Sequence, residues 1–208
     1  MRKENKKTDY ILAWLILVGA SIQNRFFDKI ISIAGMDAIS LLLMLILFFA
    51  FGRYALNSHL KFKKTEFALT AYTLCICAFS VAGSGVTSSV LLCFRTMIYF
   101  MIAFVFFKNA KLNEEDIIHI FKTAGFFNAL ICLFFYIQNV KIYGAGFRDV
   151  SINLYFSLFA IILCLFSKTS NEKKVAKLEI IFICTTAIIT SQQRTQIIPL
   201  ALVFVLYA

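Results

Sequence analysis

Two arginines in polar surroundings are the residues of this sequence best suited to chemistry. Arg194 lies in the run Thr-Ser-Gln-Gln-Arg-Thr-Gln, where seven hydrogen-bonding residues separate two apolar stretches. A guanidinium group binds phosphate through two parallel hydrogen bonds, and a following helix N-terminus would offer N–H groups to the same anion. The pattern indicates a phosphate or pyrophosphate site. An interfacial arginine among residues that cap helix ends explains it as well.

The second arginine, Arg148, follows Gly144 and Gly146 and precedes Asp149, with Asn153 a few residues further on. Glycine allows the backbone to turn tightly here. On these residues alone, a loop with a local pair between Arg148 and Asp149 is the simpler explanation, and an anion site is the alternative.

A third arginine, Arg95, lies within an apolar stretch, about seven residues or roughly 10 Å from its start if the stretch is helical. An arginine at such a depth in a membrane snorkels to the interface, pairs, or lines a wet cavity. Snorkelling and the binding of an anionic group both remain open for Arg95.

Other chemistries have little support in the sequence. The two histidines, His59 and His119, are far apart, and no metal-ligand spacing, phosphate-binding glycine loop or Ser/His/Asp set occurs. We therefore expect no metal and no cofactor. All six cysteines fall in apolar stretches, where we expect them to act as small hydrophobic residues in helix packing.

The elements that hold these residues are strongly apolar. Of the 208 residues, 61% are hydrophobic and 24 are Phe, which is more apolar surface than one small core can bury. We expect an all-α polytopic transmembrane helix bundle of about eight spans, forming a single integral-membrane domain over residues 1–208. The expected spans are Tyr10–Ile22, Met36–Phe51, Phe67–Ala82, Ser88–Phe107, Thr123–Ile137, Ile152–Phe166, Leu178–Thr190 and Ile197–Ala208.

Loop charges predict the orientation of these spans. With the N-terminus in the cytoplasm, fifteen Lys and Arg residues fall in cytoplasmic segments and five in outer loops. Positive residues concentrate on the cytoplasmic side of membrane proteins. We therefore expect a multi-pass protein of the cytoplasmic membrane, with Arg148 and Arg194 outside. This distribution explains the net charge of +10 without nucleic acid.

Local signals predict two helix starts. Asn113 followed by Glu114, Glu115 and Asp116 is typical of a capped helix N-terminus. The sole proline, Pro199, predicts a helix that begins near it and leaves Arg194 in the preceding segment. The last span is incomplete, because the chain stops at residue 208 about ten residues into an apolar run. We expect the N-terminal part of a longer protein.

Three stretches, in this order, resemble the bacterial O-antigen ligase and polysaccharide polymerase-like membrane proteins. The first runs from Phe94-Arg95 to Gln138, and the second is Gly-Phe-Arg-Asp-Val-Ser-Ile-Asn, which ends at Asn153. The third, around Arg194, is similar to the family's Thr/Ser-x-x-Arg element at the start of a helix. Together they cover residues 93–208.

The resemblance implies an enzyme that joins glycans carried on undecaprenyl pyrophosphate at the outer face of the cytoplasmic membrane, with inversion and without a metal. Arg194 and Arg148 would be catalytic, because preorganised cations stabilise the leaving pyrophosphate. The substrate-binding residues would be Arg95, Asn153, Gln193 and Ser191. The family's further catalytic residues lie later in the chain, so we expect residues 1–208 alone to be inactive.

The favoured function is the polymerisation of lipid-linked repeat units into a capsular, exopolysaccharide or O-antigen polymer. The alternatives are a ligase that transfers finished glycan, a transporter (flippase) of lipid-linked glycan, and a structural membrane subunit. One proline and the expected lack of a buried acid disfavour transport. The expected partners are the lipid-linked glycan, the bilayer and other polysaccharide-assembly membrane proteins, and not nucleic acid.

Overall fold

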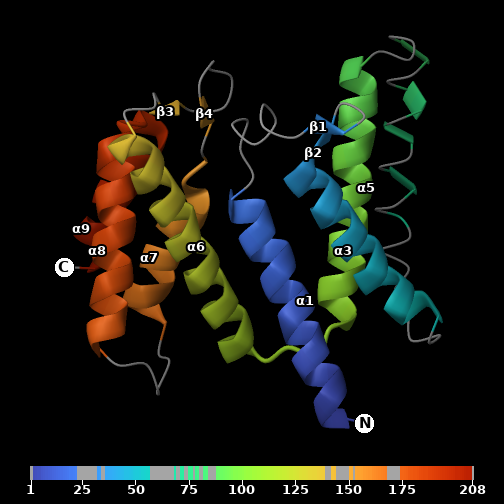
Figure 1. Ribbon diagram of the computed structural model, residues 1–208, viewed down its shortest axis with the longest axis horizontal. Coiled ribbons are helices and arrows are strands. Elements are labelled where there is room, and N and C mark those ends of the chain that lie inside the picture. The colour runs from blue at the N-terminus through green and yellow to red at the C-terminus, as the bar shows by residue number, and fades with distance from the viewer. Residues whose placement is uncertain are drawn as a thin grey trace. The chain divides into compact units, whose positions relative to one another are not determined.

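The computed structural model describes residues 2–22, 32–33, 36–56, 88–138, 142–143, 150–151, 153–167 and 174–207, with short pieces between 68 and 83. Apart from two pairs of two-residue strands, the regular structure of this part is helical, which confirms the expected all-α class (Figure 1). The helices are α1 (Arg2–Ile22), α3 (Ala38–Leu56), α5 (Ser88–Asn109), α6 (Glu114–Ile137), α7 (Tyr155–Phe166), α8 (Lys174–Ser191) and α9 (Arg194–Tyr207).

The strands are short pairings between helices. β1 (Ser32–Ile33) pairs antiparallel with β2 (Met36–Asp37), and β3 (Ile142–Tyr143) pairs parallel with β4 (Val150–Ser151). Because each strand has only two residues, none of them forms a layer of the fold.

The chain divides into two compact units. The larger unit comprises Met1–Leu43 and Leu112–Ala208, and the smaller one Met44–Lys111. The prediction of one domain over residues 1–208 stays a prediction. In the smaller unit, the ring of Tyr54 meets that of Phe106 edge to face, with 6.1 Å between centroids, and Phe106 is fully buried.

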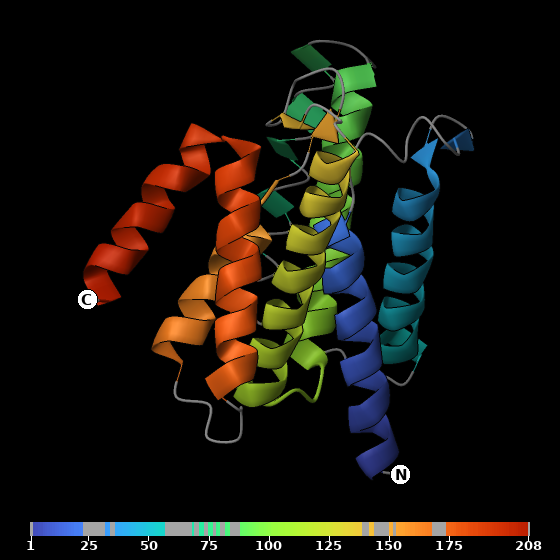
Figure 2. The same cartoon turned by 60° about the vertical axis from the view of Figure 1, so that its left-hand side comes forward.

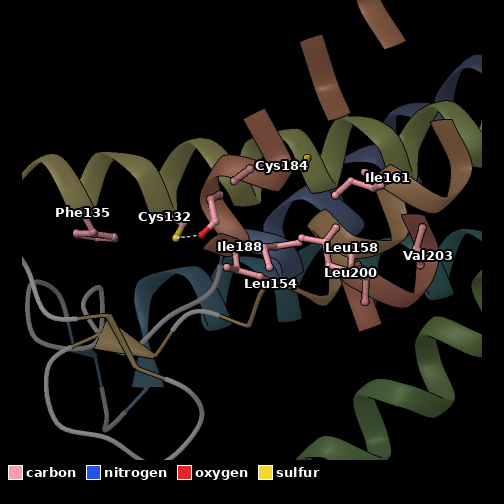
Figure 3. Close-up of a cluster of buried hydrophobic side chains, with 12 residues drawn as sticks. Cys132, Phe135, Leu154, Leu158, Ile161, Cys184, Ile188, Leu200 and Val203 are labelled. Atoms are coloured by element: carbon pink, nitrogen blue, oxygen red, sulfur yellow. Dashed lines mark hydrogen bonds between the residues drawn. The ribbon is translucent and has the colours of Figure 1, made fainter. Parts of the chain in front are cut away.

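Helix α6 is the centre of the larger unit. It contacts α1, α7 and α8, while α9 contacts α7 and α8, as Figure 2 shows. Figure 3 shows that apolar side chains from α6 to α9 meet in one buried cluster. Its members are Ala129, Cys132, Phe135, Leu154, Leu158, Ala160, Ile161, Cys184, Ala187, Ile188, Leu200 and Val203.

Two of the cysteines in this cluster bear out the prediction that cysteine serves packing. Cys132 and Cys184 are fully buried, and each thiol lies 3.6 Å from a backbone carbonyl oxygen of a neighbouring helix. Figure 3 shows the contact of Cys132 with the Ala187 carbonyl. Cys164 is also buried, whereas Cys75 is exposed, and its expected role stays a prediction. Cys77 and the side chain of Cys93 lie outside the described part.

Side-chain contacts give the direction of α1 relative to α6. Lys6 and Asp116 meet near the start of both helices, and Ser21 meets Asn128 further along both. The two helices therefore run parallel. This is the relation expected of a first and a fifth span in an alternating series.

The next helices alternate in direction. Ser157 near the start of α7 bonds to Asn128, and Ala160 lies against Gly125 one turn earlier in α6, so α7 runs antiparallel to α6. Helix α8 runs in the direction of α6 again, as the colour gradients of both helices show in Figures 1 and 2. The expected reversal of direction from one helix to the next is present in this unit.

Helix α6 begins where the acidic motif predicts. The backbone N–H of Asn113 donates to the carboxylate of Asp116 over 2.9 Å, and Ile117 N–H bonds to the Asn113 carbonyl. From Glu114 the helix continues to Ile137, so the expected span Thr123–Ile137 is the second part of a longer helix.

The described structure supports fewer membrane spans than the eight predicted from the sequence. Among the described residues, one helix, α6, is long and apolar enough to cross a membrane by length and composition. Shorter apolar helices are Leu41–Tyr54, Ile98–Asn109, Tyr155–Phe166 and Arg194–Tyr207. The expected span Phe67–Ala82 falls mostly outside the described residues. The described helices therefore support one crossing segment.

Candidate functional site

The turn between α8 and α9 positions the strongest candidate residue. Gln192 has a positive φ of 53°, and its N–H bonds to the carbonyl of Ile189, which closes α8 with a left-handed residue. The carbonyl of Gln193 accepts from the N–H groups of Gln196 and Ile197, both at 3.0 Å. Helix α9 therefore starts immediately after α8 ends.

This turn corrects the predicted start of α9. We expected the helix to begin near Pro199 and to leave Arg194 before it, but Arg194 is the first residue of α9 and Pro199 lies inside it. In this second helical turn, proline removes the hydrogen bond to the Thr195 carbonyl, and its ring crowds that carbonyl. Burial of Leu200 and Val203 in the cluster favours the helix after the proline, and the two hydrogen bonds to the Gln193 carbonyl form the turn before it.

Arg194 is exposed at the N-terminus of α9. Within the described residues its side chain makes no hydrogen bond or ion pair. Glu179 is the one acid that the structure describes between residues 153 and 207, and it lies far from Arg194 along α8. The positive end of the α9 dipole therefore adds to the Arg194 charge.

A second helix begins beside this turn. Asn153 Oδ1 accepts a 3.1 Å hydrogen bond from Tyr155 N–H in the first turn of α7, and Gln196 Nε2 approaches the same oxygen at 3.5 Å. At the far ends of the two helices, the rings of Phe166 and Tyr207 meet with centroids 5.7 Å apart. Helices α7 and α9 thus run parallel, with both N-termini at the same end of the larger unit.

The predicted site residues are gathered only in part. Asn153 lies at the N-terminus of α7, while Ser191, Gln193 and Arg194 lie in the turn before α9. Asn153 and Arg194 are exposed, but Ser191 and Gln193 are 6% and 8% exposed, and the Ser191 hydroxyl donates to the Ile188 carbonyl. The buried pair shapes the turn, and the exposed pair faces solvent.

The described structure does not place the side chains of the other two arginines. Arg148 lies outside the described residues. Arg95 belongs to α5 in the smaller unit, and its side chain is not described. Their expected roles stay predictions.

Gln196 is a site residue that the sequence did not single out. It is 3% exposed, and its Oε1 has no hydrogen-bond partner among the described residues. A buried acceptor without a partner is unusual in a folded protein. Its sequence signal was weak, because it is the last of the seven polar residues around Arg194.

A second polar group lies where α1 meets α6. Lys6 Nζ is 2.9 Å from Asp116 Oδ2, and Tyr10 Oη is 2.8 Å from His119 Nδ1. Partial burial raises the pKa of Asp116. The hydrogen bonds from Lys6 and from the Asn113 N–H, with the Lys6 and His119 charges, outweigh that effect and hold the pKa below its ordinary value.

Two charged residues of the larger unit are buried. Asp9 of α1 and Lys122 of α6 are each 1% exposed, and each interacts with other groups in the protein. Lys122, one of the fifteen Lys and Arg residues assigned to cytoplasmic segments, is therefore buried within a helix and not a solvated loop charge. Asp9 also contradicts the expectation that the chain has no buried acid, which was one argument against transport.

The described residues hold no group of three or more His, Cys, Asp or Glu side chains that could bind a metal ion. Comparisons with protein-family models, with curated proteins and with solved structures give no match. The resemblance to the polymerase and ligase family is therefore carried by the residues quoted for it.

Proposed function

We propose that this protein polymerises lipid-linked oligosaccharide repeat units into a surface polysaccharide at the outer face of the cytoplasmic membrane. One observation carries the proposal. An exposed arginine, Arg194, that lacks a counter-ion in the described residues opens α9 where the N-terminus of α7 also lies. Two helix dipoles and a guanidinium group make this end of the unit suited to a pyrophosphate.

The proposed reaction uses the site to stabilise a leaving group. The acceptor hydroxyl oxygen attacks the anomeric carbon of the sugar on the donor lipid, while the bond from that carbon to the pyrophosphate oxygen breaks. The hydroxyl proton leaves to a base, and undecaprenyl pyrophosphate departs with the electron pair of the broken bond. Negative charge grows on the pyrophosphate, so Arg194, with Arg148 as the second catalytic residue, lowers the barrier.

The membrane setting of the proposal rests on two findings and one inference. Helix α6 is long and apolar enough to cross a bilayer, and α6, α7 and α8 alternate in direction. The remaining spans and the cytoplasmic N-terminus come from the excess of lysine in alternate loops. Together they support a multi-pass protein with Arg194 on the outer side.

The test is Arg194→Ala in the intact protein, expressed in the cells that make the polysaccharide. We expect polymer to disappear and lipid-linked repeat units to accumulate. Arg194→Lys should restore little, because an ammonium group does not reproduce bidentate contact. Thr195→Ala is the matched control, because this neighbouring side chain is also exposed and makes no described hydrogen bond. Normal polymer from Arg194→Ala would refute the proposal.

The ligase alternative uses the same chemistry with a different acceptor. Loss of a ligase would leave long lipid-linked polymer, whereas loss of a polymerase leaves single repeat units. The length of the glycan on the carrier in the Arg194→Ala strain therefore separates the two functions.

One observation favours transport as a second candidate. The buried Asp9 and Lys122 are the type of charged groups that line transport routes in membrane bundles. A transport defect leaves the lipid-linked units in the inner leaflet, and a polymerase defect leaves them in the outer leaflet. A glycan-degrading enzyme added to spheroplasts, which reaches only the outer leaflet, distinguishes these outcomes.

A further inference from the structure

We infer that Asn153 and Gln196 together bind a neutral, hydroxyl-bearing group, namely the sugar attached to the pyrophosphate. This inference rests on the proposed function and adds to it a sugar-binding pair beside the anion-binding Arg194. It also names Gln196 as a binding residue.

The side chain of Gln196 is buried, although it ends in a polar amide. The residue is 3% exposed, and Oε1 has no hydrogen-bond partner among the described residues. A buried carbonyl oxygen without a donor destabilises the folded state, so a simple apolar side chain would suit this position better for folding alone. A ligand that donates a hydrogen bond to Gln196 Oε1 would explain why this position carries an amide.

The amides of Asn153 and Gln196 have hydrogen-bonding groups that suit a sugar. Gln196 Nε2 reaches Asn153 Oδ1 at 3.5 Å, which is the long limit of a hydrogen bond and is easily replaced by a better one. Asn153 Oδ1 is fixed by the Tyr155 N–H, so the amide of Asn153 is oriented. Two neutral amides present both acceptors and donors, which matches sugar hydroxyls, since each hydroxyl donates and accepts.

Asn153 and Gln196 lie at the same end of the larger unit as Arg194. Gln196 and Arg194 lie within the first turn of α9, and Asn153 precedes the first turn of α7. A sugar is linked directly to its pyrophosphate, so its binding groups must lie next to the cation. The neutral pair and Arg194 lie at the same end of the larger unit, which agrees with this requirement.

The experiment compares two ligands. One is lipid-linked glycan from cells that lack this protein, and the other is undecaprenyl pyrophosphate that carries no glycan. Binding of each lipid to the purified full-length protein in detergent is measured for wild type, Gln196→Met and Arg194→Ala. Gln196→Met conserves size and removes both hydrogen-bonding atoms, and Thr195→Ala is the control.

We expect Gln196→Met to weaken binding of the glycan-bearing lipid by about three- to tenfold, which corresponds to the loss of one or two neutral hydrogen bonds. Its affinity for the glycan-free lipid and its melting temperature should be unchanged, or the melting temperature should rise. Arg194→Ala should weaken binding of both lipids.

The outcomes separate the inference from the proposed function. If Arg194→Ala binds the glycan-free lipid as wild type does, the pyrophosphate site of the proposed function is wrong. If wild type binds both lipids equally, or Gln196→Met weakens both equally, the sugar-binding pair is refuted. A lower melting temperature with unchanged lipid discrimination would show that Gln196 serves only to hold Asn153.

Discussion

Asn128 Nδ2 donates a 2.7 Å hydrogen bond to the backbone carbonyl of Ser21, 107 residues earlier in the chain. Ser21 lies in the last turn of α1, where helix carbonyls lack intrahelical partners. Asn128 Oδ1 accepts a 2.8 Å bond from Ser157 Oγ in α7. One buried amide of α6 therefore connects three helices.

Replacement of this amide should loosen the larger unit. Asn128→Leu leaves the Ser21 carbonyl and the Ser157 hydroxyl with one partner fewer, and we expect the free energy of unfolding to fall by ~1–3 kcal/mol. Thermal unfolding in detergent measures the effect. In a double-mutant cycle with Ser157→Ala the two effects should not add. Asn109→Ala, whose amide donates within its own helix, is the control and should have a smaller effect.

Close packing of α6 on α7 gives a prediction about glycine. A Cβ at Gly125 would overlap the Ala160 side chain and the backbone carbonyl of Phe156, which cannot move without α7. Gly125→Ala should therefore destabilise the protein by ~1–3 kcal/mol or more. At Gly52 in α3 a Cβ would meet nothing within 4 Å, so Gly52→Ala should be neutral or slightly stabilising. Equal melting temperatures for the two variants would contradict this packing.

The ion pair between Lys6 and Asp116 should make stability depend on pH. The folded-state pKa of Asp116 lies below its ordinary value of 3.8, so the ionised carboxylate stabilises the folded state above that pH. This contribution is lost as the pH falls through the folded-state pKa. Asp116→Asn should therefore lower the melting temperature at pH 7 and have a smaller effect near pH 3. Glu115→Gln, an exposed neighbour, should have little effect at either pH.

The charge of the proposed site can be tested at Asn153. Asn153→Asp keeps an oxygen that accepts from Tyr155 N–H, and aspartate suits a helix N-terminus, so the fold should be unchanged or more stable. An added negative charge next to Arg194 should repel a pyrophosphate and reduce polymer severalfold or more. Polymer yield and melting temperature, measured on the same variant, give the comparison. Full activity of Asn153→Asp would exclude an anion from this end of α7.

Membrane orientation can be tested by cysteine labelling. A cysteine placed at Gly144 should react with an impermeant maleimide added to intact cells, and one placed at Lys173 should react only after lysis. Protein without an introduced cysteine sets the background, because Cys75 is exposed. Labelling of the Lys173 position from outside would reverse the orientation deduced from the lysines.

The pattern of apolar residues predicted which segments of the larger unit are helical. It placed the helix ends a few residues away from those in the structure. The expected spans Ile152–Phe166 and Leu178–Thr190 became α7 (Tyr155–Phe166) and α8 (Lys174–Ser191). The start of α9 was missed because Pro199 carries only a local preference. The left-handed Gln192 and the hydrogen bonds to the Gln193 carbonyl, which set the start, are seen only in the structure.

Only those features of the site that depend on neighbouring residues in the sequence could be predicted. Arg194 stood out because a polar run separates two apolar ones, and this does not depend on the fold. The roles of Gln196, Asn128 and Asp9 depend on which helix face meets which, and the sequence pattern alone does not contain that information. Their polarity within or beside apolar helices was visible, but their burial was not.

The length of α7 has a consequence for the bilayer. Twelve residues rise about 18 Å, well short of the ~30 Å hydrocarbon layer. In a protein that crosses the membrane here, non-helical backbone before Tyr155 or after Phe166 would lie below the lipid headgroups, and this is tolerated only under protein cover or beside water. Before Tyr155, Leu154 is fully buried against protein, and the exposed Asn153 would need water or a polar ligand around it.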